Sequence, residues 1–458
     1  MKGLITLSVI AALSSSVLAE DTTQAQIDAL TKEIQKLKKD QTNTKKSLSA
    51  VKKATGGDNI KFGVDFRNAV DVIEYKNNET GETATNDSLL TSRLYLDMAA
   101  APMNNLIFKG RLAIYSTWGS HLYVTDGPLK DWSASSKAAD TVMRVKEAYF
   151  VYKNKLGAQP ITFSIGRRPS TNGFLANYRE NEQTSGSPLA HITNMEVNGA
   201  MVKLDWSRFV DGAYTKFVYG RAHSGEMEGV YGDDSAARFP YADLDTVKED
   251  ESVDFFVMPG DAYNNGQYQV AYQWAHIFDT KGENISTAQT AVAAGSADLF
   301  SLALKVDGIG DEINDFLDST TVFISGAYTN YISDDGYSIL GKEGGSVHGS
   351  SVWVGAIIPD GITDSGKFGF EYNHGSKFWT PMTWAEDTAI GSKVAVRGDA
   401  YEAYWNFNLF GVEYLPSQIR YTYAQHDYTP NINCAGWEEP VATDITAQDI
   451  RLAVSYKY

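Results

Sequence analysis

The final stretch of the chain, Asp449-Ile450-Arg451-Leu452-Ala453-Val454-Ser455-Tyr456-Lys457-Tyr458, alternates strictly between two kinds of side chain. One face of an extended strand would carry the apolar set, which is Ile450, Leu452, Val454, Tyr456 and Tyr458. The other face would carry Asp449, Arg451, Ala453, Ser455 and Lys457. Because successive side chains of a strand point to opposite faces, the stretch predicts a β-strand with one apolar face and an aromatic last residue.

This ending resembles the terminal strand by which outer-membrane proteins are recognised by the barrel-assembly machinery. The resemblance implies that Tyr456 and Tyr458 form an assembly signal and that this machinery is a partner. The alternative is a soluble protein that ends in tyrosine by chance.

The same alternation recurs along the chain after Gly57. In one run, Leu90, Ser92, Leu94, Leu96 and Met98 alternate with Thr91, Arg93, Tyr95 and Asp97. Two asparagines at 104–105 separate this run from a second one at 106–115, which predicts a hairpin. Residues 267–274 and 401–409 repeat the pattern. Alternation alone fits both a soluble sandwich and a membrane barrel, because only the direction of the apolar face differs.

Three features favour the membrane barrel. The polar faces carry Arg and Lys in the middle of long strands, and the apolar faces contain Tyr and Trp. The connections also alternate in length: the short turn at 104–105 contrasts with long polar connections expected near 119–141, 220–265 and 334–350. At about 10 residues per spanning strand, residues 58–458 predict an all-β transmembrane antiparallel barrel of roughly 16 to 18 strands with an aqueous lumen.

The N-terminus predicts export. A basic Lys2, an apolar run from Leu4 to Leu13 and a small-residue ending at Ala19 are typical of a secretory signal peptide at 1–19, cleaved after Ala19. A retained membrane helix is the alternative, but the apolar run is shorter than the ~20 residues such a helix needs. The single Cys434 leaves no internal disulfide in an exported chain.

Residues 20–57 predict a periplasmic helix followed by a glycine linker, ahead of the barrel at 58–458. One stripe runs through Ile27, Leu30, Ile34, Leu37, Gln41, Thr44, Leu48 and Val51 at alternating spacings of 3 and 4. This heptad pattern predicts a coiled coil, and we expect Ile27, Leu30, Ile34, Leu37, Leu48 and Val51 to assemble a homotrimer. The alternative is an amphipathic helix that lies on the rim of the barrel or plugs its mouth.

The segment Gly166-Arg167-Arg168-Pro169-Ser170-Thr171-Asn172-Gly173 is the most distinctive part of the barrel region. A strand delivers two arginines into an irregular loop, and Arg179 follows. These groups could form a basic patch for anionic solutes, pair with acids on an inward loop, or bind lipopolysaccharide phosphates outside. From strand phase, the pore-lining candidates are Arg93, Lys109, Arg111, Arg167, Arg168, Arg179, Arg420 and Arg451, with Asp97 and Glu402 as counter-charges.

Composition and motifs argue against other functions. The net charge of −17 and the absence of a basic patch disfavour nucleic-acid binding. None of the seven histidines falls in a nucleophile or metal motif, so no enzyme, cofactor or metal site is expected. His374 lies close to Ser376 in sequence, but two such residues share a strand face by default, and a solvent-facing histidine is the expectation.

With these features together, the chain resembles bacterial outer-membrane porins. The arginine segment above and the stretch from Lys367 to Leu409, with Phe378-Trp379-Thr380-Pro381, more narrowly resemble a porin-like family known only as a domain of unknown function. The resemblance implies a barrel in the bacterial outer membrane, in contact with membrane lipid and lipopolysaccharide. We expect a channel for passive diffusion of small hydrophilic solutes or ions. The alternatives are a surface adhesin or binding scaffold, a sheath around a partner protein and, third, a lipid-modifying enzyme.

Overall fold

The structure is a computed structural model that describes ten stretches of the chain. They are residues 60–119, 142–169, 171–182, 184–186, 188–223, 252–310, 313–363, 365–383, 387–430 and 437–458. The expected signal peptide at 1–19, the expected helix and linker at 20–57 with its heptad stripe, and most of the connection at 119–141 lie outside the described residues.

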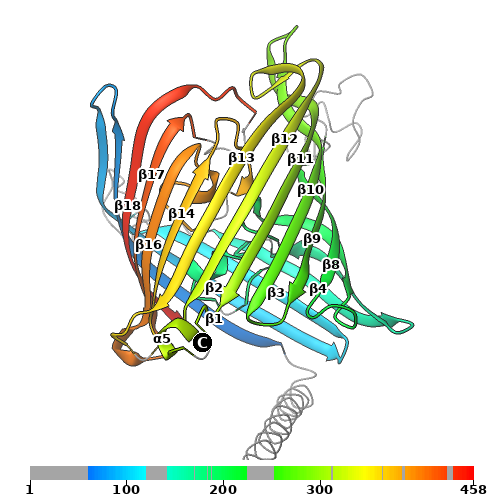
Figure 1. Cartoon of the computed structure of the whole chain (residues 1–458), viewed down its shortest axis with the longest axis vertical. Coiled ribbons are helices and arrows are strands. Elements are labelled where there is room, and N and C mark those ends of the chain that lie inside the picture. Colours follow the sequence, from blue (N-terminus) through cyan, green and yellow to red (C-terminus); the bar gives the residue numbers. More distant parts are fainter. Residues whose placement is uncertain are drawn as a thin grey trace, which may run out of the picture. The chain divides into compact units, whose positions relative to one another are not determined.

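Sixteen strands within the described residues form one closed antiparallel barrel (Figure 1). In chain order they are β1 (Lys61–Asn77), β2 (Thr83–Met103), β3 (Leu106–Thr117), β4 (Met143–Leu156), β5 (Gln159–Arg168), β7 (Val197–Asp205), β8 (Tyr214–His223), β9 (Val253–Asn264), β10 (Tyr268–Asn284), β11 (Gln289–Asp307), β12 (Thr321–Ile339), β13 (Lys342–Pro359), β14 (Lys367–Gly375), β16 (Gly398–Asn408), β17 (Pro416–Tyr428) and β18 (Ala442–Lys457). Strand β1 pairs with β2 and with β18, which closes the ring. The prediction of 16 to 18 strands is confirmed.

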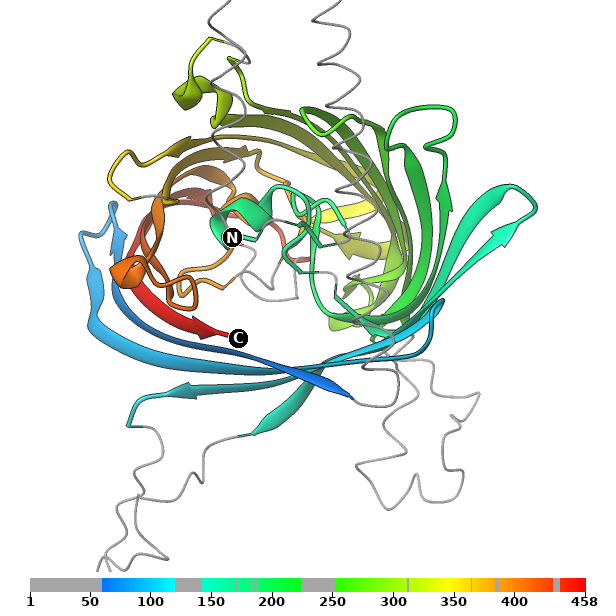
Figure 2. The ribbon, with the colours of Figure 1, turned by 90° about the horizontal axis from the view of Figure 1, so that it is seen from below.

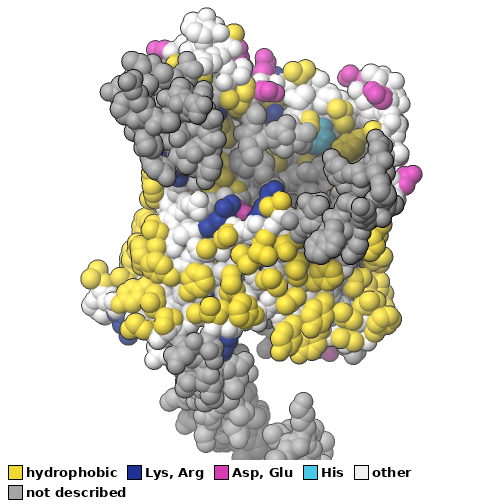
Figure 3. All heavy atoms as spheres, turned by 180° about the vertical axis from the view of Figure 1, so that it is seen from behind, with side chains coloured by type: hydrophobic (Ala, Val, Ile, Leu, Met, Phe, Trp, Pro, Cys, Tyr) yellow, Lys and Arg dark blue, Asp and Glu magenta, His cyan; other side chains and the backbone are white. Residues whose placement is uncertain are grey.

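The barrel turns its apolar faces outward, as the sequence predicts for a membrane barrel. In β11, Phe300, Leu302 and Leu304 are 46%, 53% and 44% exposed, whereas the alternating Leu299 and Ser301 are buried. Figure 3 shows the apolar side chains as a band across the wall. Such a band is unfavourable in water and favourable against lipid hydrocarbon, so the fold places this protein in the bacterial outer membrane.

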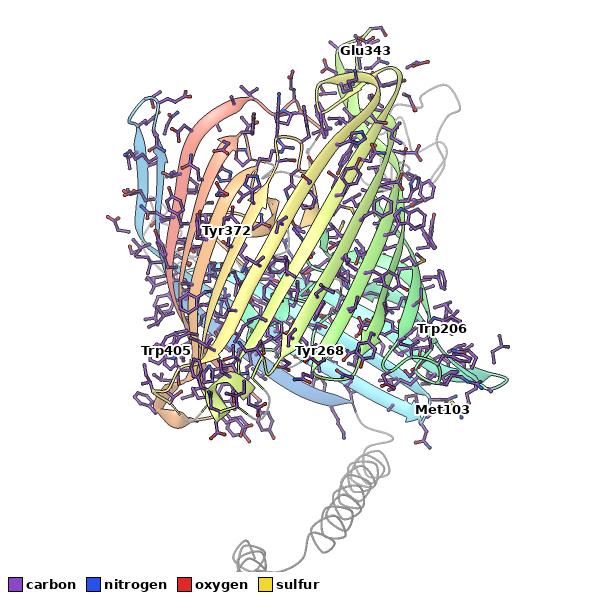
Figure 4. All side chains as sticks on the ribbon, in the orientation of Figure 1. Met103, Trp206, Tyr268, Glu343, Tyr372 and Trp405 are labelled. Carbon is purple, nitrogen blue, oxygen red and sulfur yellow. The ribbon has the colours of Figure 1, made fainter. Side chains whose placement is uncertain are left out.

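Aromatic side chains mark the lower edge of this band. Trp206, Tyr268 and Trp405 come from different parts of the barrel and lie at a similar height on the wall (Figure 4). Tyrosine and tryptophan are favoured at a membrane interface because their rings are apolar and their polar groups reach water.

One expected loop is wrong. The region near 334–350 is a tall hairpin rather than a long loop, because β12 and β13 continue to Ile339 and Lys342 and turn at Leu340–Gly341. Glu343 lies beside this turn, at the end of the barrel opposite Tyr268 (Figure 4). The polar composition suggested a loop, but strands that pair above the membrane can be polar on both faces. The connection expected at 220–265 is also shorter, because β8 reaches His223 and β9 begins at Val253.

Two connections fold into the lumen. The first inward segment is residues 169–196 without 170, 183 and 187, and the second is residues 376–383 with 387–397. They carry α3 (Ala176–Arg179), β6 (Thr193–Asn194), β15 (Met382–Thr383) and the 3-10 helix η3 (Lys393–Ala395). Strands β6 and β15 pair in parallel and join the two segments. Seen from below, α3 lies inside the ring of strands (Figure 2).

The inward segments form the main apolar core of the protein. Ile192, Trp379 and Met382 pack among buried residues of the wall, and Leu175 and Val394 belong to a second buried cluster around Trp353. Two other short helices, α5 (Asp315–Asp318) and η4 (Leu409–Gly411), lie between barrel strands. Of the helices in the described part of the chain, none is both long enough and apolar enough to cross a lipid bilayer.

Candidate pore constriction

The first inward segment is fixed to the far wall by a buried histidine. The ring nitrogens of His191 lie 2.8 Å from Ser325 Oγ of β12 and 2.9 Å from Ser351 Oγ of β13. Its ring also packs edge-on against Trp353 and Trp379, with centroid distances of 5.7 and 5.5 Å. Burial lowers the pKa of His191 to about 3, so the ring is neutral at ordinary pH and serves as a hydrogen-bonding anchor.

The second inward segment is fixed by Asp387, which contacts four arginines from four neighbouring strands. Its carboxylate forms ion pairs with Arg67 of β1, with Arg93 of β2 at 2.7 Å, and with Arg451 of β18 at 3.1 Å. Its backbone oxygen accepts hydrogen bonds from Arg420 at 2.9 Å and from Arg451 at 2.8 Å. One loop carboxylate therefore offsets much of the positive charge of this part of the wall.

A second ionic cluster lies on the adjoining strands. Lys393 of η3 forms ion pairs with Glu371 of β14, at 2.7 Å, and with Glu402 of β16. Arg179 of α3 lies 2.9 Å from Glu180 and 3.9 Å from Glu402. Because opposite charges attract strongly away from water, these pairs hold the inward segments against β14 and β16.

Glu180 is kept charged by this environment. Burial by itself would raise the pKa of Glu180, but the positive charges of Arg179, Arg93 and Arg420 outweigh it and hold the pKa at about 2. The first inward segment therefore presents a permanent negative charge to a basic wall.

Beside the first inward segment, a cavity of about 630 Å³ with a mixed polar and apolar lining remains. Its charged lining residues are Lys61, Lys109, Arg111, Arg168 and Lys216, with Asp97, Glu147 and Glu182. Neutral polar groups come from Thr171, Asn172, Thr184 and Ser185, and Tyr149 adds an aromatic ring. A space of this size could hold water and a metabolite-sized solute.

A family model described as a protein of unknown function (DUF3373) matches residues 83–456. The chain belongs to this family. A comparison with curated protein sequences gave no match.

Solved structures of similar fold are outer-membrane proteins. OmpT of Vibrio cholerae shares 12% identity over 87% of this chain and 97% of its own, with a TM-score of 0.46. OprB of Pseudomonas putida shares 12% identity over 87% of this chain and 94% of its own, with a TM-score of 0.45. A mutant of the Rh. blastica porin shares 13% identity over 87% of this chain and 100% of its own, with a TM-score of 0.39.

The structure of this DUF3373 member divides the predicted pore-lining residues into three groups. Lys109, Arg111, Asp97 and Arg168 line the cavity. Arg93, Arg179, Arg420, Arg451 and Glu402 face inward but are buried in the ionic clusters that hold the inward segments. Arg167 is outside the residues that line the cavity, and its guanidinium lies 3.9 Å from Glu196, which also pairs with Lys146.

Several residues of the site were not among the sequence candidates. Arg67 and Glu147 lie in alternating strands and could have been found by the same phase argument that selected Arg93. Asp387, His191 and Lys393 lie in irregular segments, where no periodicity indicates direction.

The remaining predicted residues are surface features of the wall. Tyr456 and Tyr458 are exposed, and the backbone of Tyr458 pairs with Val64 of β1 where the barrel closes. His374 is half-exposed, 2.9 Å from Asp399. The described residues contain no group of three or more His, Cys, Asp or Glu arranged to hold a metal ion.

Proposed function

We propose that this protein is a porin that forms a water-filled channel for passive diffusion of small hydrophilic solutes or ions. The observation that carries the proposal is the cavity of about 630 Å³, lined by wall charges, beside the first inward segment of a closed sixteen-strand barrel. Segments that narrow a wide lumen without removing its polar surface suit a size-limited diffusion path.

The charge arrangement supports a selective channel. Positive groups of β1, β2, β17 and β18 face the negative Asp387 and Glu180 of the inward segments. Fixed charges on low-dielectric walls concentrate the field in the space between them. We propose that this field orients polar solutes and that Arg93, Lys109, Arg111, Arg168, Arg179, Arg420, Arg451, Asp97 and Glu402 shape it. Arg167 lies outside the cavity lining and is not part of this set.

We also propose that the channel is a homotrimer assembled through the heptad stripe at 27–51. One of the solved structures of similar fold is described as a trimer form. Lipopolysaccharide is the proposed neighbour of the apolar band, and the barrel-assembly machinery is the proposed partner of the terminal strand with Tyr456 and Tyr458.

The test is planar-bilayer conductance of the purified protein folded in detergent, with a salt gradient across the bilayer. Stable, ohmic single-channel steps are expected, and their reversal potential reports ion selectivity. Folding is checked independently by the strand signal in circular dichroism and by heat-modifiable migration in a gel. Persistent electrical silence from folded protein would contradict the proposal.

The second candidate is a barrel that serves as a binding scaffold, an adhesin or a sheath for a partner protein. The apolar core inside the lumen favours it, because Trp379, Leu175 and Val394 are fully buried and fill space that an open pore would leave to water. On this alternative, the folded protein would be silent in bilayers and would keep its inward segments docked.

A further inference from the structure

The cavity beside the first inward segment is more basic than the protein around it. Five cationic and three acidic side chains line it, although the whole chain carries a net charge of −17. Two of the three acids share one arginine: Arg111 forms hydrogen bonds of 2.6 and 3.1 Å with Asp97 and lies 3.5 Å from Glu147. Counted by side chain, the lining has two more cations than acids.

The third acid is Glu182 of the first inward segment. Burial raises the pKa of Glu182, and the neighbouring negative charge of Glu180 raises it further. Glu182 also accepts a hydrogen bond of 3.4 Å from Asn172.

Arg168 shares a buried guanidinium nitrogen without a hydrogen-bond partner with Arg67, Arg93, Arg167 and Arg420, but it differs from Arg93 in having no carboxylate partner among the described residues. Its side chain is 9% exposed, and its guanidinium carbon lies 5.4 Å from the centroid of the Tyr149 ring. Within the part of the chain that the structure describes, no carboxylate lies within 4.0 Å of it, and its buried Nη1 has no hydrogen-bond partner. Arg93 and Arg451, by contrast, are paired with Asp387.

A buried guanidinium nitrogen without a partner is costly, because the group has lost water and gained no acceptor. An oxyanion that entered the cavity would supply that acceptor. Carboxylate and phosphate both match the planar fork of arginine, which can donate two parallel hydrogen bonds. Thr171, Asn172 and Ser185 line the same space and offer hydroxyl and amide groups to the rest of the solute.

We propose that Arg168 is the recognition residue of an oxyanion site in the lumen, and that the solutes carried are small molecules bearing a carboxylate or phosphate group. This inference rests on the proposed channel function and names its substrate class. Lys109 lines the same cavity and raises the local concentration of anions. Binding is weak enough to release the solute, as conduction requires.

The experiment compares wild type with R168Q, R168K and the matched control R167Q. Arg167 carries the same charge one residue away but lies outside the cavity lining, 3.9 Å from Glu196. Each folded protein is measured in bilayers for the reversal potential in a KCl gradient and for block of the current by succinate, by inorganic phosphate and by neutral glucose.

R168Q should lower the ratio of anion to cation permeability and weaken block by the oxyanions about tenfold, the effect of losing a charged hydrogen bond. R168K should keep the ion selectivity but lose most of the block, because lysine lacks the planar fork. R167Q should match wild type in reversal potential and in block by the oxyanions. The effect of glucose should be the same in all the proteins. Stronger block by succinate or by phosphate identifies which oxyanion the site prefers.

Equal selectivity and equal block in wild type and R168Q would overturn the oxyanion site while leaving the channel intact. A silent wild type would instead overturn the channel. Isothermal titration of the folded protein with millimolar succinate and phosphate then tests the oxyanion site independently of conduction. Heat of binding that is present in wild type and absent in R168Q supports the site, and equal heat in both proteins rejects it.

Discussion

The carboxylate of Asp387 lies 2.7 Å from the guanidinium of Arg93, although 294 positions separate the two residues in sequence. This pair joins the second inward segment to β2, and Arg67 and Arg451 complete the same cluster. One loop carboxylate therefore pairs with three wall arginines and helps to hold the second inward segment in the lumen.

Replacing Asp387 by Asn should release the second inward segment. The wall arginines would lose their shared partner, and the loss of one member of a largely buried ion cluster lowers the free energy of unfolding by on the order of 3 kcal/mol. The expected result is a larger and noisier conductance with a stronger anion preference. Single-channel recording and urea unfolding in detergent measure both effects.

The control for Asp387 is D254N. Asp254 pairs with Arg221 at 2.7 Å, and both belong to wall strands outside the cavity lining. D254N should leave the conductance level and the unfolding midpoint nearly unchanged. If D387N behaved like D254N, Asp387 would not fix the segment.

Protonation of His191 should make stability depend on pH. Burial lowers the pKa of His191 from 6.5 to about 3 in the folded protein, so the unfolded chain binds more protons between these two values. The stabilisation is complete above pH 6.5 and is lost progressively as pH falls toward 3, by up to about 1.4 kcal/mol for each pH unit. H191Q should remove this part of the pH dependence and lower stability at pH 7 by about 2 kcal/mol.

The measurement is the urea midpoint at pH 7 and pH 4 for wild type, H191Q and H374Q. His374 is half-exposed on the outer wall, so its replacement serves as the control. A wild-type pH dependence that survives in H191Q would show that other groups cause it.

Replacing Lys393 by Met should leave Glu371 and Glu402 as two buried, neighbouring carboxylates on β14 and β16. Removing one partner of a buried ion pair lowers the free energy of unfolding by about 3 to 5 kcal/mol. The double variant K393M/E371Q should recover about half of that loss, because Glu402 still lies 3.9 Å from both Arg179 and Arg420. A double-mutant cycle from urea unfolding gives the coupling, and strictly additive effects would argue against a shared cluster.

Replacing both Ile34 and Leu37 by Asp should dissociate the oligomer, because the two substitutions place charges in the heptad stripe. The mass in mild detergent, from light scattering after size exclusion, should fall from three chains to one. The variant K36D changes a position outside the stripe and should keep the wild-type mass. An unaltered mass in I34D/L37D would reject assembly through this segment.

The strands and their faces could be predicted from the sequence. Arg93 and Leu94 fall on opposite faces of β2 in the structure, as the alternation of residues 90–98 predicts, and the terminal strand pairs with β1 to close the ring. This alternation depends only on the geometry of each residue and its immediate neighbours, so the sequence of a strand is enough to predict it. The loop predicted near 334–350 was wrong, because polar composition does not distinguish paired strands in water from loops. The structure has a tall hairpin there that turns at Leu340–Gly341.

Only the tertiary structure decided what the arginines do. Arg167 and Arg168 are adjacent and look equivalent in sequence, yet one lies near Glu196 and the other lines the cavity without a carboxylate partner among the described residues. Arg93 and Arg451 were expected in an open lumen and are covered by Asp387. Their partner Asp387 lies in an irregular segment, 294 positions from Arg93 and 64 from Arg451, where no local pattern fixes direction. Charge pairing across the lumen is therefore determined by the closed fold and not by any stretch of the chain.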